Sequence, residues 1–446
     1  MSEVPPFGFG PPAGDDDESR RRGGSGADNP LAGFLGSMNP SDLGAAFQRL
    51  GQMLSHQGSD PVNWDLAREV ARQTVSEGRD RSVTGKEQAQ IEEATRLAEL
   101  WLDPVTNVPA ATSGASAWSR AEWVEATLPV WKQLVEPIAG RVVAAMGDVL
   151  PGEMAPMAGP FLGLMRTMGG AMFGAQVGQA LGSLAGEVVG STDVGLPLNP
   201  AGRVALLPQN ISAFGSGLGL PDDEVRVYLA LREAAHQRLF AHVSWLRTHL
   251  LGAVEGYARG INVDTQRLEQ AIGQLDPNNP EALQEALSSG MFEPEQTPGQ
   301  KAALARLETI LALVEGWVDT VVDEAAAQRL PSAAALRESV RRRRAAGGPA
   351  EQTFATLVGL ELRPRRLREA ARLWTALGEA RGGEGRDAVW AHPDLLPSTE
   401  DLDDPEAFVH RTELDLPALD DAAPDEGAPG EGAPGEGDGP RPGEGG

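Results

Sequence analysis

Residues 231–236, Leu-Arg-Glu-Ala-Ala-His, place three ionisable side chains within one and a half turns of an expected helix. The metal-binding motif His-Glu-x-x-His has this spacing. Its two imidazoles hold a metal ion from successive turns, and its Glu takes a proton from the metal-bound water. Glu233 and His236 occupy the second and last positions of that motif, whereas Arg232 stands at the first. Since Arg232 and His236 are four residues apart, they share one helix face. The segment therefore has the pattern of a metal-hydrolase helix without its first ligand.

A third ligand would have to come from another element, and Glu315 is the candidate. It lies in a second expected helix, over about 298–329, beside an apolar stripe that includes Leu311 and Val318. A partly buried carboxylate without a partner is costly, so Glu315 needs a cation, a metal or a donor. Asp319, one turn later, would be placed to orient a ligating His from outside the metal shell.

His242 follows the first motif position by ten residues, the spacing of the third ligand in the longer zinc motif that ends Gly-x-x-His. That arrangement needs the chain to turn at a Gly, and Leu239 stands at the corresponding position. In a continuous helix, His242 would lie about 120° from His236 around the axis. We therefore interpret His242 and His249 as helix-surface or interface residues.

The helical period dominates the chain, and no sustained period-2 alternation occurs. Two capping boxes, Thr84 with Glu87 and Ser119 with Glu122, each precede an apolar-periodic run. Helices are expected over about 41–54, 60–77, from 84, from 119, and over about 222–250, 264–275, 280–288, 298–329, 332–345 and 364–381. The fold class is therefore mainly α, a large helical domain with little or no sheet.

Glycine recurs at every fourth position from Gly170 to Gly190. Each Gly costs a helix about 1 kcal/mol relative to Ala, so the repeat needs a reason. In a membrane span it would be a dimerisation stripe, but we favour a buried core helix with a groove that a neighbouring helix approaches closely.

Composition divides the 446 residues into three parts. Residues 1–38 form a Gly- and Pro-rich segment expected to be disordered, 39–397 a helical domain, and 398–446 an acidic tail also expected to be disordered. The net charge of −26 argues against nucleic-acid binding, since phosphates would be repelled. The basic run 341–344 is interpreted as a solvated helix end.

The chain has no Cys, which excludes disulfides and thiolate metal sites. The N-terminal residues lack the pattern of a signal peptide. The uncharged stretch 167–186 is too rich in Gly and polar residues for a convincing membrane span. These features predict a cytoplasmic protein.

Five stretches resemble a known family, the bacterial zincin-like hydrolases of the zinc-dependent metalloprotease type, in the branch whose His-Glu-x-x-His motif is degenerate. They are residues 118–123, 174–182, 231–236, 250–255 and 313–317, and the resemblance extends over roughly 40–410. It implies a mostly helical domain with a metallopeptidase-like helix pair, and zinc-dependent peptide hydrolysis in members with the full motif. By position, Glu233 matches the general base, His236 the second zinc ligand and Glu315 the third, whereas Arg232 departs from the family at the first ligand.

Two hypotheses follow. In the first, Arg232 pairs with Glu315 or Glu233, and the protein is a catalytically silent pseudoenzyme that binds a peptide or protein partner or has a structural role. A guanidinium cannot act as a Lewis acid or activate water as zinc does. In the second, the protein is an active zinc metallopeptidase with His236, Glu315 and one further donor as ligands and Glu233 as general base. The sequence leaves the oligomeric state open.

Overall fold

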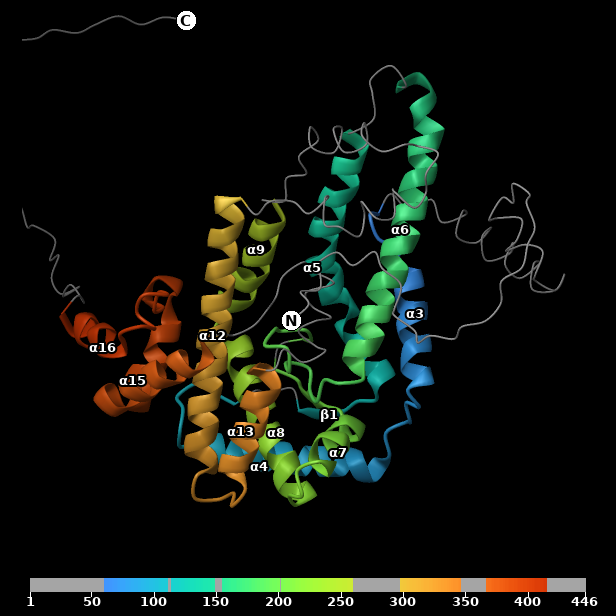
Figure 1. The fold of residues 1–446 in the computed structure, drawn as a ribbon. Helices are drawn as coiled ribbons and strands as arrows, with labels where there is room; N and C mark the ends of the chain where they lie inside the picture. Colours follow the sequence, from blue (N-terminus) through green and yellow to red (C-terminus); the bar gives the residue numbers. More distant parts are fainter. Residues whose placement is uncertain are drawn as a thin grey trace, which may run out of the picture.

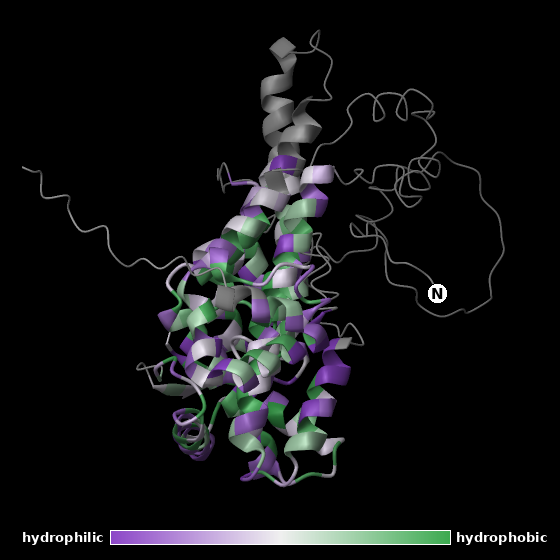
Figure 2. Ribbon diagram, turned by 90° about the vertical axis from the view of Figure 1, so that its left-hand side faces the viewer, coloured by the Kyte–Doolittle hydropathy of each residue, from purple (hydrophilic) through white to green (hydrophobic). Residues whose placement is uncertain are grey.

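A computed structural model describes residues 60–110, 114–148, 155–200, 202–259, 297–345 and 366–414. The expected helices over 41–54, 264–275 and 280–288, the expected disordered segment 1–38 and residues 415–446 of the expected disordered tail lie outside this part of the chain. Residues 398–414 of that tail are described, and they include the helix Pro405–Leu414, on which Phe408 and Val409 are buried. Within the described part of the chain, helices dominate, which confirms the mainly α fold class (Figure 1). Most helices carry both hydrophilic and hydrophobic residues, as amphipathic elements around a core require (Figure 2).

The centre of the molecule is a pair of long helices, α8 (Asp222–His242) and α12 (Pro298–Ala326), which pack against one another. Both are buried around much of their circumference, so they form the core rather than cover it. The helices packed on them are α4 (Gly85–Leu102), α9 (Leu246–Arg259) and α15 (Leu367–Asp387). The short helix α13 (Ala333–Ala345) follows α12 and lies beside α8 (Figure 1).

Local capping explains where several helices begin. The Thr84 hydroxyl accepts from the main-chain N–H of Glu87, whose carboxylate accepts from the N–H of Thr84, and the same reciprocal pair joins Ser119 and Glu122. Both capping boxes are as the sequence predicts, and they open α4 and α5 (Arg120–Asp148). A third box at Thr297 opens α12.

The glycine repeat lies mostly on α6 (Ala155–Ala185) and faces α3 (Trp64–Glu77). A Cβ at Gly178 would stand 2.8 Å from the Cβ of Val70, and one at Gly182 would stand 2.5 Å from the Cβ of Thr74. The two helices therefore approach along the groove that the repeat forms, as the sequence predicts.

The described sheet is small. Strands β1 (Ala115–Ala117) and β2 (Val204–Leu206) pair in parallel, with Ser116 opposite Ala205. The remaining described elements are α7 (Pro208–Ser216), the 3-10 turns η2 (Ala388–Ala391) and η3 (Pro393–Leu395), and α16 (Pro405–Leu414).

One helix prediction was wrong. The single helix expected over 222–250 ends at His242, and α9 begins at Leu246. Val243 leaves the helical conformation, and the break directs Val243, Leu246 and Leu250 into the core. The apolar repeat continues across the break, so its period alone does not reveal the bend.

No helix in the described part of the chain is long and apolar enough to cross a membrane.

Candidate functional site

The three motif residues of α8 are all buried, although all three are ionisable. Arg232, Glu233 and His236 are 6%, 3% and 2% exposed. Burial of such groups is tolerated only when each has a partner. The hydrogen bonds and ion pairs of these three side chains therefore define the site.

Arg232 reaches across to α12. Its Nη2 donates to Oε2 of Glu315 at 2.8 Å, and its Nη1 stands 3.5 Å from Oδ1 of Asp319. The guanidinium therefore lies between the two helices, against the carboxylate that the sequence suggests as a third metal ligand.

His236 contacts the same carboxylate from one turn further along α8. Its Nε2 is 3.0 Å from Oε1 of Glu315, and its Nδ1 is 2.8 Å from the main-chain carbonyl oxygen of Arg232. Both ring nitrogens thus face oxygens, and both can donate only when the ring is a protonated imidazolium. The imidazole ring is oriented by this carbonyl oxygen and by Glu315. Asp319, which was expected to orient the ring, contacts Arg232 and Arg341 instead.

Glu315 has a third partner that sequence reasoning missed. Arg344, near the end of α13, brings its Nη1 to 2.7 Å from Oε1 of Glu315. Burial alone would raise the pKa of Glu315, but Arg344, His236 and Arg232 together hold it well below its usual range. The carboxylate is therefore ionised and surrounded by positive charge.

Asp319 likewise binds guanidinium groups. Its Oδ2 pairs with Arg341 of α13, while its Oδ1 faces Arg232. The interpretation of residues 341–344 as a solvated helix end was therefore wrong for Arg341 and Arg344, whose partners are buried. It holds for Arg342, whose side chain is 77% exposed and pairs with Glu338 of the same helix. Sequence alone gives no sign of which face of a four-arginine run is covered.

Glu233 points away from Glu315, into the loop that follows α6. It accepts from the Ser191 hydroxyl, and its Oε2 accepts from the main-chain N–H of Thr192 at 3.1 Å and from the Thr192 hydroxyl at 2.6 Å. Burial raises the pKa of Glu233, and these donors offset only part of that rise. Sequence reasoning did not find Ser191 or Thr192, because no motif relates them to α8.

Gly190 allows this loop to lie against Glu233. A Cβ at this position would stand 2.5 Å from Oε2 of Glu233 and 3.2 Å from the carbonyl oxygen of Ala205. The repeat of glycines in the sequence thus includes one member, beyond the end of α6, that serves the site rather than the helix groove.

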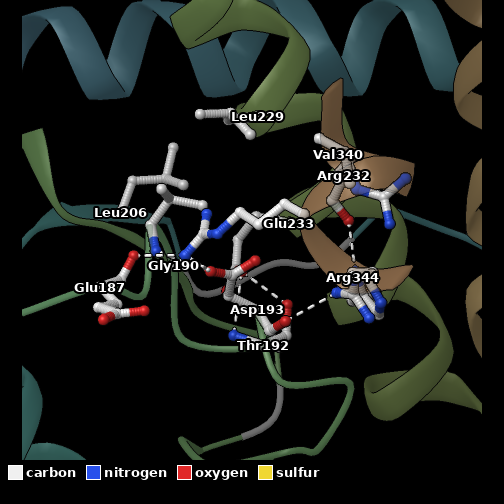
Figure 3. A pocket seen from close by; sticks show the side chains of 13 residues that line it. Glu187, Gly190, Thr192, Asp193, Leu206, Leu229, Arg232, Glu233, Val340 and Arg344 are labelled. Carbon is white, nitrogen blue, oxygen red and sulfur yellow. Dashed lines mark hydrogen bonds and ion pairs between the residues drawn. The ribbon is translucent and has the colours of Figure 1, made fainter. Parts of the chain in front are cut away.

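A small cavity of about 40 Å³, which we call the cleft, lies over this cluster, with room for a few water molecules. It is lined by α8, α13 and the loop after α6, and Figure 3 shows Arg344 extending from α13 towards Asp193. Its lining residues are Glu187, Val189, Gly190, Thr192, Asp193, Leu206, Leu229, Arg232, Glu233, His236, Val340, Arg343 and Arg344.

The other candidate histidines lie elsewhere. Nε2 of His242 is 3.3 Å from the carbonyl oxygen of Ala110, and the His249 ring packs edge-on against Trp245. Among the described residues, no group of three or more His, Cys, Asp or Glu side chains is placed to hold a metal ion.

Comparison with known proteins identifies the family. A family model described as zincin-like metallopeptidase matches residues 62–409. A crystal structure from Chloroflexus aurantiacus, described as a "putative hydrolase with a novel fold", superposes with a TM-score of 0.56 at 22% identity and covers 79% of this chain and 99% of its own. At that identity the likeness concerns the fold. No curated protein matches this sequence. The match over most of its length shows that the chain belongs to the zincin-like metallopeptidase family.

Proposed function

We propose that this protein is a catalytically silent member of its family, in which Arg232 has replaced the first zinc ligand and the cleft serves binding or structure instead of hydrolysis. One observation carries the proposal: Nη2 of Arg232 lies 2.8 Å from Oε2 of Glu315. The side chain that replaces a ligand neutralises the carboxylate that would be another ligand.

The donor set does not fit a catalytic zinc ion. Such sites use three protein ligands, with neutral imidazoles and ionised carboxylates. Here Glu315 is engaged by Arg232 and Arg344, and Nε2 of His236 is directed at the same carboxylate. A dication placed beside two guanidinium groups would be repelled by both, and a guanidinium supplies no Lewis acidity.

Metal analysis of the purified chain tests this proposal. The wild-type protein should carry substoichiometric zinc after dialysis against zinc-containing buffer, and His236→Ala should leave that content unchanged. Arg232→His is the matched comparison, because it supplies the missing imidazole and removes one of the two guanidiniums; it should raise the zinc content. Stoichiometric zinc in the wild type that is lost in His236→Ala would overturn the proposal.

The second candidate is an active hydrolase with an atypical ligand set. The observation in its favour is that Glu233 and His236 both line the cavity, which can admit water. Glu233→Gln separates the two functions. Peptide hydrolysis by the wild type that disappears in Glu233→Gln, with the fold intact by circular dichroism, would favour the active enzyme. We expect no hydrolysis above background in either protein.

A further inference from the structure

Helix α13 closes the cleft, yet little apolar surface attaches it to the body. Among residues 333–344, whose burial the structure describes, only Ala333, Leu336 and Val340 are buried hydrophobics. Helices in globular proteins are held mainly by packing of an apolar face, so a helix with so few buried groups depends on its polar contacts.

Those polar contacts come from arginines. Arg337, in the middle of the helix, pairs with Asp323 of α12, and the others lie near its C-terminal end. Arg341 pairs with Asp319, and Nη1 of Arg344 lies 2.7 Å from Oε1 of Glu315, so two guanidiniums are bound to buried carboxylates of α12. The second residue of the run, Arg342, points to solvent and makes its ion pair within α13.

The same helix end also binds the loop after α6. Nη2 of Arg344 donates to the carbonyl oxygen of Asp193 at 2.7 Å, and Nη2 of Arg343 donates to that of Glu187 at 2.5 Å and stands 3.3 Å from Oδ2 of Asp193. This loop supplies the groups that hold Glu233, so α13 bridges the two walls of the cleft. Figure 3 shows the loop side of this bridge, where Arg344 contacts Asp193.

We propose that α13 is a strap, defined as residues 333–345, which closes the cleft through Arg341, Arg343 and Arg344 and can lift from it as a unit. In the closed state, the arginines of the strap occupy the site that a partner's guanidinium groups would bind. Lifting it exposes Glu315, Asp319 and Asp193, together with main-chain carbonyls of the loop, to a guanidinium-bearing segment of a peptide partner. The inference rests on the proposed function in one respect, that Glu315 is not engaged by zinc.

Amide hydrogen exchange tests the strap in the full chain, in buffer that contains a chelator. Arg344→Ala should accelerate exchange in the strap and in residues 187–199 by about tenfold or more, because a charged hydrogen-bond pair at the opening is lost. Exchange in α8 and α12 should stay at the wild-type rate. Arg342→Ala is the matched control from the same helix end, and it should leave every rate unchanged.

Two outcomes would overturn the strap. If exchange in Arg344→Ala rises equally in α8 and α12, α13 is an inseparable part of the core. If exchange in the strap does not change, the arginines do not hold it. Arg344→Lys guards against a variant that fails to fold, since it keeps the charge but cannot reach Glu315 and Asp193 together, and it should show the same local acceleration in weaker form.

Chemical rescue tests the ligand class. Millimolar methylguanidinium added to Arg344→Ala should restore slow exchange in residues 187–199, whereas methylammonium should not, because it lacks the planar fork that spans a carboxylate and a carbonyl. The wild type should respond to neither compound, since its own arginine occupies the site at high effective concentration. Absence of rescue by methylguanidinium would overturn the assigned ligand class. Because a chelator is present throughout, a zinc-binding wild type would refute the proposed function without altering these results.

Discussion

At the scale of single residues, the partners of Glu315 distinguish a metal site from an ion-pair cluster. Two guanidinium groups and one imidazole converge on it, from two different helices. The motif in the sequence predicts that Arg232 pairs with Glu315 or Glu233, and in the structure Arg232 pairs with Glu315. It does not predict Arg344, whose helix contributes nothing to such a motif.

Glu315→Gln should be strongly destabilising. It removes the negative charge that Arg232 and Arg344 share, and loss of one partner from a buried ion pair typically costs about 3–5 kcal/mol. Denaturant unfolding followed by circular dichroism would measure the change in free energy of unfolding. Glu338→Gln is the control, since it removes an exposed carboxylate that pairs within one helix, and it should have no measurable effect. A loss below about 1 kcal/mol in Glu315→Gln would contradict the buried cluster.

Glu315 and Glu233 should contribute to stability in opposite pH ranges. The pKa of Glu315 is lowered in the fold from its ordinary 4.5, so its contribution is complete above that pH and is lost as the pH falls. The pKa of Glu233 is raised from the same value, so its contribution is complete below pH 4.5 and declines as the pH rises through the raised value.

Unfolding curves collected at several pH values would show this contrast. The stability difference between wild type and Glu315→Gln should shrink on acidification, whereas the difference between wild type and Glu233→Gln should shrink as the pH rises above about 4.5. Parallel pH dependence of the two differences would contradict the assigned environments.

At the scale of elements, features that depend on neighbouring residues were predictable from the sequence, whereas features that depend on long-range packing were not. The capping boxes at Thr84 and Ser119 depend on residues three apart, and both were predicted. The end of α8 at His242 depends on where α9 must pack, and it was not. The contacts of Ser191 with Glu233 join positions 42 residues apart, with no pattern to connect them.

The glycine groove permits a test by paired substitutions on one helix. Gly178→Ala should destabilise the protein, because its Cβ would lie 2.8 Å from that of Val70, and overpacking usually costs about 1–3 kcal/mol. Gly169→Ala on the same helix meets nothing within 4 Å, and it should stabilise by up to about 1 kcal/mol through helix propensity. Thermal unfolding would measure both, and a stabilising Gly178→Ala would show that α3 and α6 do not depend on the groove.

At the scale of the whole molecule, the distribution of charge separates the helical domain from the chain end. The full chain carries a net charge of −26, and the sequence from Glu400 onward contains fifteen acidic residues and two arginines. Glu315, by contrast, lies among guanidinium groups inside the domain. The overall acidity therefore says nothing about the site, where Arg232 and Arg344 both pair with the Glu315 carboxylate.

Removal of residues 415–446 should leave the stability of the helical domain unchanged. This segment holds nine acids and one arginine, so its loss changes the formal net charge from −26 to −18. Its composition of Gly, Pro and acids offers little apolar surface to bury, and substitutions away from packed groups usually change stability by less than about 0.5 kcal/mol. The truncated and full-length chains should therefore unfold at the same temperature.

The effect of the truncation should instead be on association. Lower net charge weakens the repulsion between molecules, so the truncated protein should associate more readily at low ionic strength, as measured by light scattering. At about 1 M salt the screening length falls to about 3 Å, and the two proteins should then behave alike. A truncated protein that unfolds at a lower temperature would show that the acidic segment contacts the domain, and the arginines of α13 would be the first place to look for that contact.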